Sequence, residues 1–202
     1  MQKIVECVPN FSEGKDGKII NAIFDAAKTV KSVKVFELES NKDHNRCLFT
    51  IVGEPEDVLA SVFESVKIAT KLIDMEKHVG EHPRIGATDV VPFVPVSGVT
   101  MEECVELAKK LGKKVGEELG IPVFLYEEAA TKPENRNLAD VRKGEYEGLK
   151  VEMNQPDFGP NKTHPTAGAT VIGARKYLVA FNVNLDTPDV EIAKKIASVI
   201  RE

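Results

Sequence analysis

The sequence predicts an α+β fold: a ferredoxin-like mixed β-sheet with helices packed mainly on one face, as in an α/β sandwich. The first observation behind this prediction is the order of the segments. Strand-like and helix-like patterns follow one another as β-α-β-β-α-β-α-β, the order of a split βαβ arrangement. The second observation is size, because 202 residues are enough for one large or two small domains with a substantial core.

Seven segments have the alternation or the apolar, β-branched composition of strands. In a sheet their successive side chains would point to opposite faces. The expected strands are 3–8, 33–38, 47–52, 90–96, 122–126, 168–172 and 177–185.

Four segments repeat apolar residues at i, i+3 and i+4, which predicts helices that each bury one stripe. Pro55 is expected at the start of the second helix, where its missing N–H costs nothing. Gly120, followed by Ile121-Pro122, is expected to end the third. The helical stripes lie in 20–27, 58–73, 104–119 and 190–200.

The stretch 131–166 is dominated by Pro, Asn, Gly and charged residues, and only 138–142 predicts a short helix. This is too long for an ordinary connection in a compact domain. It is either a binding loop or a flexible tether.

Composition favours a small-molecule partner. The chain is 42% hydrophobic and 29% charged, as in ordinary globular proteins, and its formal net charge is −5. The 27 basic residues form no run, which argues against nucleic acid and against an anionic membrane surface.

The three cysteines, Cys7, Cys47 and Cys104, are far apart and lie in apolar surroundings. We expect buried thiols in a reducing compartment, and therefore a cytoplasmic protein. The N-terminus lacks a signal-peptide pattern, and no apolar run approaches the length of a membrane span.

The segment 78–90, HVGEHPRIGATDV, concentrates two of the four histidines, an arginine and two carboxylates. Its first five residues match H-x-x-E-H, a zinc-peptidase pattern that requires a helix. Gly80 weakens a helix, and Pro83 pushes His82 toward extended backbone. We therefore favour a catalytic or ligand-binding His82 in an irregular loop. A structural role, in which both histidines bond loop backbone, stays open.

Nine segments, in one order over nearly the whole chain, are similar to the glutamate formimidoyltransferase family. They are VECVPNFSEG (5–14), NR (45–46), LIDM (72–75), the segment 78–90 with PF (92–93), PVFLY (122–126), RKGEYE (142–147), PDFGP (156–160), GATVIGAR (168–175) and AFNVN (180–184).

The resemblance implies transfer of a formimino group between N-formimino-L-glutamate and tetrahydrofolate, a step of histidine breakdown and one-carbon metabolism. Tetrahydrofolate would be a co-substrate, and no metal is implied. The family has two similar α/β subdomains that meet at a cleft. Residues 1–176 would be the N-terminal subdomain and 177–202 the start of a truncated C-terminal one, completed by a homodimer partner or a separate C-terminal half. A folate-binding module without turnover and a structural subunit are the alternatives.

The family's catalytic base falls on His82, and its unperturbed pKa of about 6.5 suits proton transfer between two nitrogens. The family's aspartate falls on Glu39, which is one methylene longer; Asp89 and Glu81 compete with it for that role. The folate-contacting loop falls on Gly159, Pro160, Asn161, Lys162, Thr163, His164, Pro165, Thr166, Ala167 and Gly168.

Four polar residues have two interpretations each. Arg84 either neutralises a substrate carboxylate or forms a loop salt bridge. Asn10 either bonds the formimino group or pterin, or is a turn residue. Lys162 either attracts a folate glutamate tail or is solvated. His164 is either a second acid or base, or an ordinary loop histidine.

Overall fold

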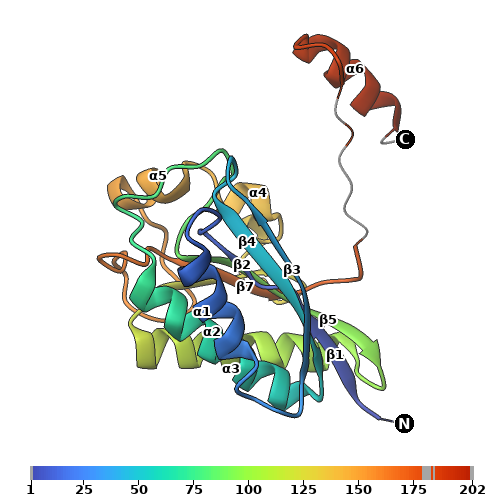
Figure 1. Ribbon diagram of the computed structural model, residues 1–202, viewed down its shortest axis with the longest axis vertical. Coiled ribbons are helices and arrows are strands. Elements are labelled where there is room, and N and C mark those ends of the chain that lie inside the picture. The colour runs from blue at the N-terminus through green and yellow to red at the C-terminus, as the bar shows by residue number, and fades with distance from the viewer. Residues whose placement is uncertain (1, 179–182, 184, 201–202) are drawn as a thin grey trace.

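A computed structural model describes residues 2–178, 183 and 185–200 (Figure 1). Its centre is a mixed seven-stranded sheet in which β1 and β2 lie between β4 and β5, followed by β7 and β6; β3 pairs with the other side of β4. β5, β7 and β6 run parallel, and the other pairings are antiparallel. The strands are β1 (Ile4–Cys7), β2 (Asn10–Phe11), β3 (Lys34–Asn41), β4 (Arg46–Gly53), β5 (Thr88–Ser97), β6 (Val123–Glu127) and β7 (Thr170–Ala174).

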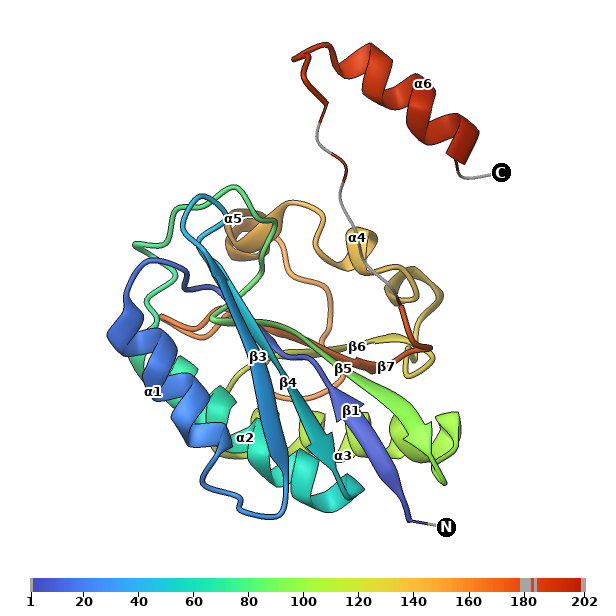
Figure 2. The ribbon, with the colours of Figure 1, turned by 45° about the vertical axis from the view of Figure 1, so that its right-hand side comes forward.

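Helices α1 (Gly17–Ala27), α2 (Pro55–Leu72) and α3 (Met101–Leu119) lie side by side over one face of this sheet (Figure 2). Each helix buries one apolar stripe there, because its apolar residues recur with helical spacing. The main core forms between these stripes and the inward side chains of the strands, with Phe11, Phe49 and Phe93 at its centre. This arrangement confirms the predicted α+β fold.

The second face of the sheet is covered over only part of its width. Val90, Phe124 and Val171 form a smaller core there, on the β5-β7-β6 side. The 131–166 stretch contains a 3₁₀ turn, η1 (Pro133–Asn135), and the short helices α4 (Leu138–Val141) and α5 (Glu145–Val151). Apolar residues of this stretch pack on that smaller core. Toward β1, β2 and β4 this face keeps half-buried polar side chains, and the candidate site lies there.

Most predicted elements are confirmed, with shifted ends. The first expected strand, 3–8, forms as β1, and the two-residue strand β2, which was not predicted, follows it after Val8 and Pro9. Pro55 begins α2, and Gly120, at a φ of +67°, ends α3. The expected strand 168–172 forms as β7, which begins two residues later at Thr170. Gly168, at a φ of +68°, instead forms isolated bridges with Gly86 and His164.

Two regions differ from the prediction or lie beyond it. Helix α5 was not predicted, and the stretch that contains it is folded onto the sheet. The expected strand 177–185 falls largely on residues 179–182 and 184, which lie outside the described part of the chain. Helix α6 (Val190–Ile200) forms as predicted. Among the described residues no helix has the length and apolarity needed to cross a bilayer.

Candidate active site

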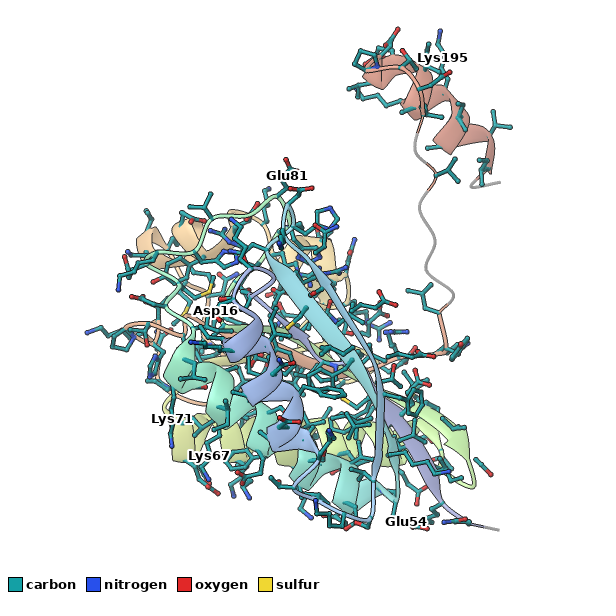
Figure 3. The ribbon with its side chains drawn as sticks, viewed as in Figure 1. Asp16, Glu54, Lys67, Lys71, Glu81 and Lys195 are labelled. Atoms are coloured by element: carbon teal, nitrogen blue, oxygen red, sulfur yellow. The ribbon has the colours of Figure 1, made fainter. Side chains whose placement is uncertain are left out.

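The His82 loop, residues 73–87, joins α2 to β5 and is irregular throughout. It packs against the turn between β3 and β4, where Glu81 N–H donates to the Asp43 carbonyl at 3.1 Å. A Cβ at Gly80 would lie 2.4 Å from the His44 carbonyl oxygen, so this close approach requires glycine. Glu81 lies at the outer tip of the loop (Figure 3). Because 78–82 is not helical, the geometry required by the zinc-peptidase pattern is absent.

His78 is held by both ring nitrogens. Arg84 Nε donates to Nδ1 at 3.2 Å, so Nε2 carries the proton and donates to the Asn45 carbonyl at 2.9 Å. Burial lowers the pKa of this imidazole, which keeps it neutral. These contacts favour a structural role for His78, in which its ring holds the loop backbone.

Arg84 is buried, with 6% of its surface exposed. Its Nη1 donates to Glu145 Oε2 at 2.6 Å and to Glu147 Oε2 at 2.8 Å, and its Nη2 donates to Glu147 Oε1 at 2.7 Å. These two carboxylates raise the pKa of the guanidinium. Of the two interpretations of Arg84, the geometry favours the salt bridge, because it joins the His82 loop to α5.

His82 meets Arg46, the first residue of β4, and Asn10, the first residue of β2. Arg46 Nη1 lies 3.2 Å from both Asn10 Oδ1 and His82 Nε2. A guanidinium can only donate, so Nε2 is an acceptor and the proton of the neutral ring is on Nδ1. Asn10 Nδ2 donates to the Val8 carbonyl at 3.0 Å, so Asn10 lies in the cluster as a strand residue.

The surroundings of His82 strongly disfavour its protonated form. Burial, together with the positive charges of Arg46 and Arg142 and the neighbouring His44, lowers its pKa from 6.5 to about 4. At neutral pH the imidazole is therefore neutral, with the lone pair of Nε2 directed at Arg46.

The three carboxylates suggested as partners of His82 lie in different environments. Asp89 is buried, accepts the Ile85 N–H at 3.1 Å and forms a salt bridge with Arg142; burial raises its pKa and Arg142 opposes the rise. Glu81 is exposed. Glu39 is exposed on β3 and lines a hollow of about 570 Å³ together with Arg46. Among the described residues, none of these carboxylates forms a hydrogen bond with the His82 ring.

The loop 159–168 is tied to the base of the His82 loop. Thr166 accepts from Met75 N–H at 2.8 Å, and Ala167 accepts from Ala87 N–H at 2.9 Å. His164 Nδ1 accepts from Thr166 and Ala167 backbone N–H groups, which favours its interpretation as a loop histidine. Exposed side chains in this loop are Pro160, Asn161, Lys162 and Pro165. Among the described residues, no hydrogen bond joins this loop directly to His82.

Sequence reasoning did not assign a role to Arg46 or to Arg142. Alternation offered one signal: Arg46 and Leu48 lie on the sheet face opposite Cys47 and Phe49. A charged residue at the start of a mostly apolar strand, on the sheet face opposite the main core, is a candidate for a functional role. No group of three or more metal-ligating His, Cys, Asp and Glu side chains occurs in the described ranges.

The fold and this cluster define an α+β protein with a neutral histidine and an arginine on the partly open face of a mixed sheet. Residues 4–175 match the formiminotransferase domain, N-terminal subdomain. The chain belongs to the formiminotransferase family.

Several curated proteins are similar over the full chain. A glutamate formimidoyltransferase of Streptococcus pyogenes serotype M1 is 51% identical over 100% of this chain and 69% of its own length. One of Thermoplasma acidophilum is 50% identical over 98% of this chain and 67% of its own length. The formimidoyltransferase-cyclodeaminase of Mus musculus is 48% identical, and the match covers 38% of it. The chain thus spans about two thirds of the shorter relatives.

Proposed function

We propose that this chain carries the His82 half of a folate-dependent formiminotransferase, which moves a formimino group between N-formimino-L-glutamate and tetrahydrofolate. The observation that carries the proposal is the 51% identity, over the whole chain, with a relative named glutamate formimidoyltransferase. The neutral His82, with Nε2 as an acceptor, supports it independently.

The reaction needs one proton to move between two nitrogens. When the folate nitrogen bonds the formimino carbon, it must lose a proton, and the glutamate nitrogen must gain one as its bond to that carbon breaks. His82 Nε2 takes the first proton and returns it to the leaving nitrogen, so none is consumed overall. The contact with Arg46 Nη1, which can only donate, favours the tautomer that accepts at Nε2.

Glu39 is proposed as the carboxylate that stabilises the transient imidazolium. It lines the same hollow as Arg46 and His44, and it is exposed, so its side chain has room to turn toward the ring. Asp89 is less suited to this role, because it is buried in a salt bridge with Arg142.

The loop 159–168 is proposed to contact the folate. Its exposed residues supply polar groups, Lys162 adds a positive charge for a glutamate tail, and its ends are fixed beside the His82 loop. We further propose that residues 1–176 form the N-terminal subdomain, that 177–202 begin a second one, and that a homodimer partner or a separate C-terminal half completes the cleft. The buried free thiols of Cys7, Cys47 and Cys104 support a cytoplasmic location.

Two measurements test the proposal. Titration with folinate, a stable folate analogue, should give saturable binding by this chain. Formimino transfer should be assayed with the chain alone and with a separately produced C-terminal half of a family relative. In the active form His82→Ala should lower turnover by roughly 10² to 10⁴ while folinate binding stays nearly unchanged, since only the base is removed.

Each outcome has a distinct meaning. No folinate binding at millimolar concentration would remove both the enzyme and the folate-module interpretations. Binding without turnover, even with the added half, would leave the folate-binding module. Full turnover in His82→Ala would refute His82 as the base.

A further inference from the structure

Three arginines surround the His82 loop, and only two of them have carboxylate partners. Arg84 is paired with Glu145 and Glu147, and Arg142 is paired with Asp89. Arg46 forms no salt bridge within the described part of the chain, although burial lowers its pKa and it lies on the partly open face of the sheet. A half-buried guanidinium without a counter-ion is a recognition element for an anion.

The hydrogen bonds of Arg46 leave most of its donors unused. A guanidinium has five N–H donors, and the side-chain bonds recorded for Arg46 within the described residues involve Nη1 alone. Both acceptors, Asn10 Oδ1 and His82 Nε2, are uncharged. Asp89 and Glu39 favour the charged form of Arg46, but neither forms a salt bridge with it; Glu39 also lines the same hollow.

The contact with His82 has a chemical consequence. A base accepts a proton through its lone pair, and the lone pair of Nε2 is directed at Arg46 Nη1, 3.2 Å away. His82 is therefore blocked, as well as held neutral, as long as Arg46 stays in place.

We propose that Arg46 binds a carboxylate of the dicarboxylic amino-acid substrate and, in turning to it, releases His82 Nε2 to act as the base. This inference rests on the proposed function and names Arg46 as the residue that couples amino-acid binding to proton transfer. A carboxylate takes two parallel N–H bonds from one guanidinium, which the neutral acceptors Asn10 and His82 do not offer.

The charges around His82 make this coupling electrostatic as well as geometric. Burial lowers the pKa of His82 most, and the charges of Arg46 from β4, Arg142 after α4 and His44 from the β3–β4 turn lower it further. Of the nearby carboxylates, Asp89 is paired with Arg142, and Glu39 lines the same hollow as Arg46. A bound carboxylate cancels the charge of Arg46, so the pKa of His82 rises from about 4 toward its usual value. The base becomes competent when its substrate is present.

Histidine-ring NMR titrations of this chain, with and without L-glutamate, test the inference directly. In the wild type, saturating L-glutamate should raise the His82 titration midpoint by about one pH unit or more. In Arg46→Gln the midpoint should start closer to 6.5 without ligand, because a neighbouring positive charge is gone, and L-glutamate should no longer move it. Its L-glutamate affinity should fall by about tenfold or more, the loss expected for a hydrogen-bonded charge pair.

Two further variants make the test specific. Arg136→Gln removes the same charge from an exposed position and should behave as the wild type. Arg46→Lys keeps the charge but not the paired donors, so its affinity should lie between those of the wild type and Arg46→Gln. If Arg46→Gln fails to fold, Arg46→Lys takes its place in the affinity measurement. Folinate affinity should change by less than about threefold in all three.

The inference is overturned if L-glutamate fails to bind the wild type at millimolar concentration, if it binds Arg46→Gln as tightly, or if the His82 midpoint moves equally in both. Loss of the proposed function gives a different pattern: no folinate binding and no formimino transfer, with the L-glutamate response of His82 still present.

Discussion

Gly173 lies in β7 between two parallel neighbours, and its missing side chain leaves the space that Tyr126 fills. A Cβ there would lie 2.4 Å from the Tyr126 ring and 2.5 Å from its backbone oxygen. Because the oxygen belongs to a paired strand, it has little freedom to move. Gly173→Ala should therefore lower the free energy of unfolding by about 1–3 kcal/mol, as measured by urea denaturation. Gly17→Ala is the matched control: it meets nothing within 4 Å and should be neutral or slightly stabilising.

For single residues, the sequence predicts which side chains are functional candidates better than it predicts which side chains contact one another. His82 was predicted because it stands in a crowded loop that Gly80 and Pro83 keep out of a helix. Its contact with Arg46 spans 36 positions and arises only once β4 lies beside the His82 loop. The alternative roles of Arg84 and Asn10 could not be separated for the same reason, because the partners that decide between them are distant in sequence.

Helix α5 stabilises the His82 loop through hydrogen bonds with Arg84. Arg84 bonds Glu145 and Glu147 from one side, and Tyr146 N–H donates to the Arg84 carbonyl at 2.9 Å. Arg84→Ala should lower the free energy of unfolding by about 1–3 kcal/mol, since it removes several charged hydrogen bonds from a buried position. Urea denaturation measures this loss, and amide exchange at Tyr146 should become faster than exchange in the centre of α3.

The separate carboxylate variants provide the comparison. Glu145→Gln and Glu147→Gln should each cost less than Arg84→Ala, because both carboxylates are largely exposed and Arg84 keeps the other partner. An unchanged free energy of unfolding in Arg84→Ala would mean that Arg84 does not hold α5 in place.

The elements follow from sequence where a local pattern is sufficient. α2 and α3 each span several turns with apolar residues at helical spacing, so they were predicted almost in full. α5 has seven residues, including Gly148, and is bounded by Gly144 at a φ of +85°. Such a short helix is marginal alone, and its contacts with Arg84 and Glu76, more than sixty positions away, stabilise it.

For the whole molecule, the order of segments was sufficient to predict a mixed sheet with helices mainly on one face. Which part of the second face stays open was not predictable. That depends on how the 131–166 stretch folds back over Phe124 and Val171, and its Gly-, Pro- and charge-rich sequence has no periodic pattern that predicts this path.

Stability of the whole molecule should depend on pH through three half-buried histidines, His78, His82 and His164. Burial lowers the pKa of His78 and His164, and burial with nearby positive charge lowers that of His82 to about 4. In the unfolded chain these groups titrate near 6.5, so between about 6.5 and 4 the unfolded state binds more protons than the folded state. Stability is therefore complete above about pH 6.5 and falls as the pH drops toward 4.

Urea midpoints measured at pH 7.5, 6.5, 5.5 and 4.5 should show this decline, although the raised pKa of the Asp89 carboxyl acts in the opposite direction. Asp74, Glu76 and Glu147 have lowered pKa values through their hydrogen bonds and ion pairs, and stability from such carboxylates is lost mainly below about pH 4.5. His82→Gln should flatten the decline between pH 6.5 and 4.5, because it removes the group with the largest histidine shift. A wild-type midpoint that stays constant from pH 7.5 to 5.5, or an unchanged slope in His82→Gln, would mean that His82 is not held neutral by the fold.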